Sequence, residues 1–158
     1  MVLPVDTESY NYRFYSNLNN DVKLESNEYG EWDIVFDNDL NDWVNIDGFD
    51  SLANACIIAI MTRFNELKIE TYEDFGCRVH ELIKTNKSRN IIYRIELFIT
   101  DTLESIRRVR KVNWVIVEDN PNHNKYNYLC KFCVSCTSDE DLEDVNSDLL
   151  IVEEKFYI

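Results

Sequence analysis

One stretch of the sequence constrains the fold more than any other: between residues 52 and 61 the only polar side chain is that of Asn54. A helix that is apolar on nearly every side must be covered by other elements over most of its surface. Just before this stretch, Asp50 or Ser51 can accept hydrogen bonds from the first free backbone N–H groups of a helix. The sequence therefore predicts a buried core helix over residues 51–67.

The rest of the chain alternates between helical and strand-like patterns. Ser88 can cap a second long helix, whose apolar residues recur at helical spacing as far as Leu103. We expect an α+β fold, with two long helices and a short helix packed against a small antiparallel sheet with a C-terminal hairpin. The short helix and the strands are expected at Val79–Lys84, Trp32–Asp37, Val112–Thr137 (the hairpin) and Leu149–Ile158.

Composition divides the chain into three parts. Residues 1–31 are rich in Asn, Tyr and acids and are expected to form an extended N-terminal arm. Residues 32–137 form the expected domain, and residues 138–158 are an acidic segment followed by a strand. The net charge is −14, but residues 84–111 carry 8 bases and 3 acids. The charge is either a set of solvated faces that favour solubility or a set of patches that orient copies and partners in an assembly.

The residues between Gly48 and Leu82 also carry a resemblance to a known family. A turn Gly, a Leu four residues on, a Thr-x-x-x-Glu helix end, an aromatic residue and a Gly ahead of a Leu-containing helix occur in this order and spacing. The chain resembles the small baseplate wedge family of contractile phage tails and related injection machines, historically labelled "acidic lysozyme". The likeness covers roughly residues 32 to 137, and the matching residues of the block are Gly48, Leu52, Thr62, Glu66, Tyr72, Gly76 and Leu82.

The resemblance implies a structural subunit rather than an enzyme. Its implied partners are the large baseplate wedge proteins, which form a core bundle, and the first ring of the tail sheath, which is contacted by strand exchange. The chain would then act in multiple copies in the virion tail baseplate, after assembly in the host cytoplasm. Family members often show Glu-Pro-Arg before the hairpin, where this sequence has Ile106-Arg107-Arg108. Candidate interface residues are Thr62, Glu66, Arg107, Arg108 and Arg110.

The basic cluster at residues 107–111 has two readings. It either complements the negative end of the second helix and is otherwise solvated, or it includes the arginine that docks onto the wedge core bundle. The strands most available for exchange with a neighbouring subunit are Trp32–Asp37 and Leu149–Ile158.

Other functions have less support in the sequence. The Cys130-x-x-Cys133-x-x-Cys136 run invites a metal reading, but alternation along a strand separates the first two sulfurs, so we expect no metal or cofactor. Neither histidine, His80 nor His123, has a spaced catalytic partner. A peptidoglycan-cleaving enzyme would need two carboxylates with separated pKa values, for which Glu66 and Asp74 are the first pair to inspect.

Charge and hydropathy exclude further classes. An acidic chain is repelled by phosphates, so nucleic acid is not an expected partner, although an acidic DNA mimic or regulator stays an alternative. The longest apolar run, residues 55–61, is far shorter than the ~20 residues of a membrane span. The first residues lack the basic start and apolar stretch of a signal peptide, and five cysteines fit a reducing compartment.

Overall fold

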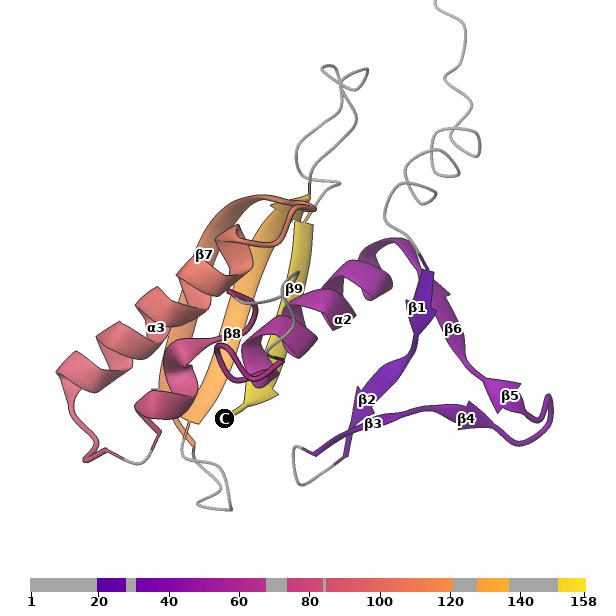
Figure 1. The fold of residues 1–158 in the computed structure, drawn as a ribbon, viewed down its shortest axis with the longest axis horizontal. Coiled ribbons are helices and arrows are strands. Elements are labelled where there is room, and N and C mark those ends of the chain that lie inside the picture. Colours follow the sequence, from indigo (N-terminus) through magenta and orange to yellow (C-terminus); the bar gives the residue numbers. More distant parts are fainter. Residues whose placement is uncertain (1–19, 28–30, 68–73, 84, 121–127, 137–150) are drawn as a thin grey trace, which may run out of the picture.

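The structure of the chain is a computed structural model that describes residues 20–27, 31–67, 74–83, 85–120, 128–136 and 151–158. These residues form two parts, which lie side by side in Figure 1. The body is a three-stranded antiparallel sheet with α2 (Gly48–Met61) and α3 (Arg89–Glu104) on one face. The β module, made of the described residues from 20 to 47, projects from the start of α2.

The body sheet has the strand order β7–β8–β9, with β8 in the centre. Alternate residues of β8 from 128 to 134 are buried, because they face the helices. The register between β7 and β8 shifts twice, between residues 109 and 111 and between 112 and 114. The three strands are β7 (Val109–Asp119), β8 (Tyr128–Cys136) and β9 (Ile151–Tyr157).

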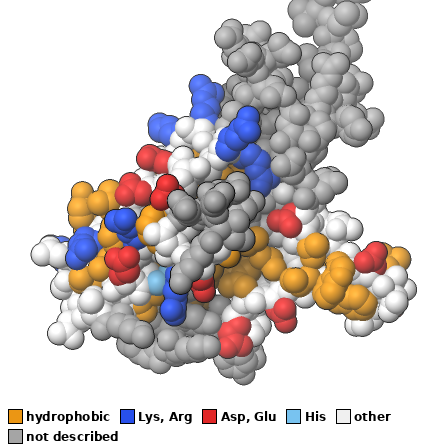
Figure 2. Space-filling model, in the orientation of Figure 1, with side chains coloured by type: hydrophobic (Ala, Val, Ile, Leu, Met, Phe, Trp, Pro, Cys, Tyr) orange, Lys and Arg blue, Asp and Glu red, His pale blue; other side chains and the backbone are white. Residues whose placement is uncertain are grey.

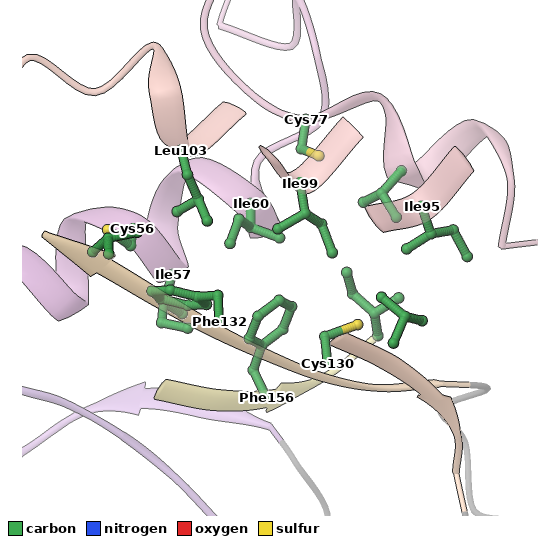
Figure 3. Close-up of a cluster of buried hydrophobic side chains, with 14 of the residues drawn as sticks. Cys56, Ile57, Ile60, Cys77, Ile95, Ile99, Leu103, Cys130, Phe132 and Phe156 are labelled. Carbon is green, nitrogen blue, oxygen red and sulfur yellow. The ribbon is translucent and has the colours of Figure 1, made fainter. Parts of the chain in front are cut away.

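The hydrophobic core lies between the two helices and the sheet. Figure 3 shows Ile60 of α2 and Ile99 and Leu103 of α3 pointing toward Phe132 and Phe156 of the sheet. All five side chains are at most 1% exposed, and the two phenyl rings lie 6.0 Å apart between centroids. The core helix predicted from the sequence is therefore buried as expected.

The β module consists of three two-stranded antiparallel ladders: β1 with β6, β2 with β3, and β4 with β5. The ladders meet at Lys23, Val35 and Val44, each of which lies between two strands. There the Lys23 N–H donates to the Val44 carbonyl (2.7 Å), Val44 to Val35 (3.0 Å) and Val35 to Lys23 (3.0 Å). At these three residues each segment passes from one ladder to the next. The three hydrogen bonds form a closed ring, so all three backbone N–H groups stay paired at this point. The strands are β1 (Asn20–Val22), β2 (Leu24–Ser26), β3 (Trp32–Ile34), β4 (Phe36–Asp37), β5 (Asp42–Trp43) and β6 (Asn45–Asp47).

Asn54 joins the β module to the body. Its side-chain amide donates to the Val22 carbonyl at 2.8 Å, and the residue is only 6% exposed. Trp32 of β3 packs against the edge of the same core. The one polar side chain in the apolar stretch of α2 therefore satisfies a carbonyl of β1 where the two parts meet.

The predicted arrangement of two long helices and a short one on a single sheet is wrong. The described residues contain two α-helices and four separate small antiparallel sheets. The expected short helix is a four-residue 3-10 turn, η2 (Arg78–Glu81), closed by a hydrogen bond from the Leu82 N–H to the Val79 carbonyl. It begins directly after residues 75–77, which are paired as extended chain with residues 62–65, and it is followed by a turn at Leu82 and Ile83.

Element boundaries also differ from the prediction. The core helix ends at Met61 rather than at residue 67, because the following residues turn to pair with the segment around Cys77. The expected strand at residues 32–37 is two strands, β3 and β4, that belong to different ladders. In the segment expected to be an extended arm, residues 20–26 form β1 and β2. By contrast, Ser88 caps α3 as predicted, accepting from the Ile91 N–H at 3.3 Å.

Candidate functional site

The five predicted interface residues fall into two groups in the structure. Thr62 and Glu66 lie just after α2, in the segment 62–66. This segment is paired with residues 75–77, and we call the two segments together the joint. Arg107, Arg108 and Arg110 lie where α3 ends and β7 begins, and Figure 2 shows basic side chains gathered over that end of the body.

The joint holds residues 62–66 against residues 75–77. The Thr62 carbonyl accepts from the Cys77 N–H at 2.8 Å, and the Asn65 N–H donates to the Phe75 carbonyl at 3.2 Å. The side chains of the predicted residues Thr62 and Glu66 both form hydrogen bonds to nearby backbone groups. Thr62 Oγ1 donates to the Ile58 carbonyl at 2.7 Å, and Glu66 Oε2 accepts from the Arg63 N–H at 3.1 Å. The Thr-x-x-x-Glu pattern therefore ends the helix, while Glu66 itself stays exposed.

Gly76 is the residue that makes the joint possible. Its φ is +106°, a conformation that residues with a side chain rarely adopt. A Cβ at this position would lie 2.6 Å from the Arg63 carbonyl oxygen and 2.8 Å from that of Thr62. The sequence pattern includes Gly76 but does not indicate its partners. The isolated glycine was the available signal, and nothing in the sequence identifies the carbonyl groups that crowd it.

Arg108 is half-buried, whereas the interpretation of the basic cluster as otherwise solvated implied an exposed side chain. Its Nη1 donates to the Ser51 hydroxyl at 3.3 Å, and Ser51 is 1% exposed in the first turns of α2. The sequence predicted only a capping role for Asp50 or Ser51, and it gave no signal for this contact between residues 57 positions apart. Arg107 and Arg110 are exposed, as is Lys111 next to them, so these side chains are the accessible part of the basic cluster.

The Arg108–Ser51 contact predicts a measurable coupling in the isolated protein. A hydrogen bond with a charged donor in a half-buried setting should contribute about 1 kcal/mol. We expect Arg108→Ala and Ser51→Ala each to lower the free energy of unfolding, and the double variant to lose about 1 kcal/mol less than the sum. The measurement is a double-mutant cycle by urea unfolding. Arg110→Ala is the matched control, with a change within about 0.5 kcal/mol, and additive effects of the first two substitutions would contradict the contact.

A cleft of about 260 Å³ opens between the joint and α3. It has charge of both signs, since Asp74, Asp101 and Arg78 all line it, and the Arg78 guanidinium lies over the Phe64 ring at 4.6 Å from the centroid. Of the carboxylate pair singled out in the sequence, Asp74 lines the cleft and Glu66 does not. Among the described residues the cleft is lined by Phe64, Asp74, Gly76, Arg78, Phe98, Asp101, Thr102 and Ser105.

The cysteines that the structure describes are separated as the strand pattern predicts. Cys130 lies in the core between sheet and helices, whereas Cys133 accepts from the Asn113 amide on the other face of the sheet, at 3.4 Å. Burial raises the pKa of the Cys130 thiol. Burial also raises the pKa of the Cys77 thiol, although hydrogen bonds at Cys77 partly oppose the shift, so both thiols stay protonated at neutral pH. The side chain of Cys136 and all of His123 lie outside the described residues.

The remaining polar candidates have structural partners. His80 contacts the Ile60 carbonyl through Nε2 at 3.0 Å. Within the described ranges, no group of three or more His, Cys, Asp or Glu side chains is placed to hold a metal ion. In the same part of the chain, neither α-helix has the length and apolar character needed to cross a membrane.

Comparison of the chain with protein-family models and with curated proteins finds no match.

Proposed function

We propose that the chain is a structural baseplate wedge subunit of a contractile tail or tail-like particle. The observation that carries the proposal is the joint. The Gly, Thr, Glu and Gly positions of the resemblance all have local structural roles, from Gly48 with its φ of +56° at the start of α2 to Gly76 against Thr62 and Arg63. These roles support the interpretation of the pattern as one folded unit.

The arrangement of exposed groups supports a role in assembly. Arg107 and Arg110 are exposed beside the half-buried Arg108, so a partner can contact the basic junction without unfolding it. The last strand, β9, pairs with β8 alone among the described residues and is an edge of the body sheet. An open edge strand is what a sheath subunit needs for the strand exchange that the resemblance implies.

The two rival functions have less support. In a lysozyme-like enzyme Glu66 would serve as acid or nucleophile, but its carboxylate closes the turn at Arg63. A DNA mimic would keep the basic middle of the chain hidden, but Arg110 and Lys111 are exposed.

Deletion of the gene tests the proposal in the genome that encodes the chain. We expect electron microscopy of induced cells or lysates to show no complete contractile tails, because a wedge lacking one subunit cannot nucleate the sheath. Wild-type protein supplied in trans should restore them. The double variant Arg107→Glu with Arg110→Glu should restore at most about a tenth as many tails, since reversed charges at an interface cost several kcal/mol. Arg89→Glu, an exposed charge reversal at the start of α3, is the control and should complement fully.

Normal tails in the deletion strain would refute the proposed function. Full complementation by the Arg107/Arg110 double variant would have a different meaning. The chain would still be a tail subunit, but Arg107 and Arg110 would not be part of its interface.

A further inference from the structure

The far end of the β module exposes a group of large apolar side chains. Phe36 and Trp43 are direct partners across the β4–β5 ladder, with ring centroids 5.2 Å apart and an edge-to-face angle of 82°. They are 41% and 50% exposed, and Leu40 in the turn beyond them is 77% exposed. Figure 2 shows hydrophobic and acidic side chains together at this end of the module. We call this surface, formed by Phe36, Asp37, Leu40, Asp42 and Trp43, the acidic tip.

The carboxylates of the acidic tip are not neutralised. Asp37 and Asp42 lie directly opposite each other in the ladder, an arrangement of like charges that destabilises a strand pair. Asp37 Oδ1 accepts from the N–H groups of Asp39 and Leu40, Asp42 Oδ1 accepts from the N–H of Trp43, and within the described ranges neither carboxylate forms an ion pair. The surroundings add negative charge, because nine acids and no lysine or arginine lie between Lys23 and Arg63 in the sequence. The ladder therefore retains a repulsion that a cationic surface would relieve.

A surface of the opposite character lies on β7, and we call it the basic strip: Arg110, Lys111, Trp114 and Ile116. Trp114 and Ile116 are 38% and 42% exposed, and both basic residues are exposed. Lys111, Trp114 and Ile116 pair with Ser135, Cys133 and Lys131 of β8, on the sheet face turned away from the helices.

The acids of β7 do not cancel the charge of the basic strip. Glu118 pairs with Lys131 at 3.0 Å and Asp119 with Lys87 at 3.1 Å. Arg110 and Lys111 have no acidic partner in the part of the chain that the structure describes. The strip thus matches the acidic tip in both respects, with aromatic and aliphatic side chains at its centre and charge of the opposite sign beside them.

These two surfaces lie on opposite sides of the molecule, since β7 is the sheet strand farthest from the β module (Figure 1). One molecule cannot bring them together. We infer that the acidic tip of one copy docks on the basic strip of a second copy, in a head-to-tail contact. Such a contact generates a ring when its rotation closes and a filament when it does not. The inference stands on the two surfaces and does not depend on the proposed role in a tail.

The net charge of −14 opposes self-association but acts mainly at long range. At physiological salt the Debye length is about 8 Å, so acids elsewhere on two copies are largely screened while pairs in contact are not. The acidic tip comprises five residues and the basic strip four, so we expect a weak contact, of the kind that becomes effective when copies are held near each other.

Sedimentation velocity of the purified full chain tests the inference. We expect the mean mass of the wild type to rise with protein concentration. Asp37→Lys with Asp42→Lys, the tip-reversed variant, and Arg110→Asp with Lys111→Asp, the strip-reversed variant, should each stay monomeric alone. An equal mixture should associate again, because it combines an intact acidic tip with an intact basic strip. Glu81→Lys with Glu104→Lys makes the same charge change as the tip-reversed variant at other exposed sites and should behave as wild type.

Three results would overturn the inference: a wild type that stays monomeric at every concentration, association that survives either reversal, or a mixture that stays monomeric. Thermal unfolding of each variant checks that it is folded. If the tip-reversed variant does not fold, Asp37→Asn with Asp42→Asn replaces it. That pair keeps the oxygen acceptors of the turn, should not lower the melting temperature, and should weaken the self-association of the chain about tenfold, the loss expected when contacting charge pairs are removed. Unchanged association would again reject the contact.

Discussion

Replacing Ile60 with Ala should lower the free energy of unfolding by about 2–5 kcal/mol, the usual cost of emptying a packed aliphatic site. Ile60 is 0% exposed and points toward the aromatic side chains of the sheet, so α2, α3 and the strands would have to collapse together to fill the space (Figure 3). Urea unfolding followed by circular dichroism measures the change.

Ile58 supplies the matched control for this prediction. It lies two residues earlier in the same helix, undergoes the same substitution and is 38% exposed. Ile58→Ala should cost less than about 1 kcal/mol, because part of the removed surface already contacts water. Equal losses at the two positions would mean that the packing of α2 against the sheet does not decide its stability.

Gly76→Ala should destabilise the protein by about 2–4 kcal/mol. The substitution combines a backbone conformation at φ +106° with a Cβ that would lie 2.6 Å from the Arg63 carbonyl oxygen. The obstructing atoms are backbone, so no flexible side chain can move aside. Thermal and urea unfolding should both report the loss.

Asn65→Gly is the control for Gly76→Ala. Asn65 also has a positive φ, 61°, but in the left-handed helical region, where Asn is tolerated. Replacing it with Gly should change the stability by no more than about 0.5 kcal/mol, because relief of the strain offsets the added freedom of the unfolded chain. A Gly76→Ala variant as stable as wild type would show that the joint can move apart at little cost.

The buried helix could be predicted because its evidence is local. The apolar stretch of α2 and the cap at Ser88 depend on neighbouring residues, and both are as expected. The sulfur positions of Cys130 and Cys133 followed from strand alternation alone. In each case the determining interaction spans a few residues, which is the range over which sequence patterns report structure.

The remaining features depend on partners that are distant in the sequence. The ring of hydrogen bonds at Lys23, Val35 and Val44 joins three segments, so no strand pattern in one segment reveals that each changes partner there. Asn54 acts on a carbonyl 32 residues away, and Arg108 on a hydroxyl 57 residues away. For this reason the sequence predicted that a helix ends within residues 62–67 and that a basic cluster precedes the hairpin. It did not predict the contacts that each makes with distant residues of the body.

Analysis of purified particles tests the central claim most directly. Contractile tails or tail-like particles should be isolated from the source of the sequence, and the chain quantified by mass spectrometry and located by electron cryomicroscopy. The wedge proposal predicts the chain in stoichiometric amounts in the baseplate, with the basic junction at Arg107 and Arg110 against a neighbouring subunit. Particles that are complete and contain none of the chain would contradict it.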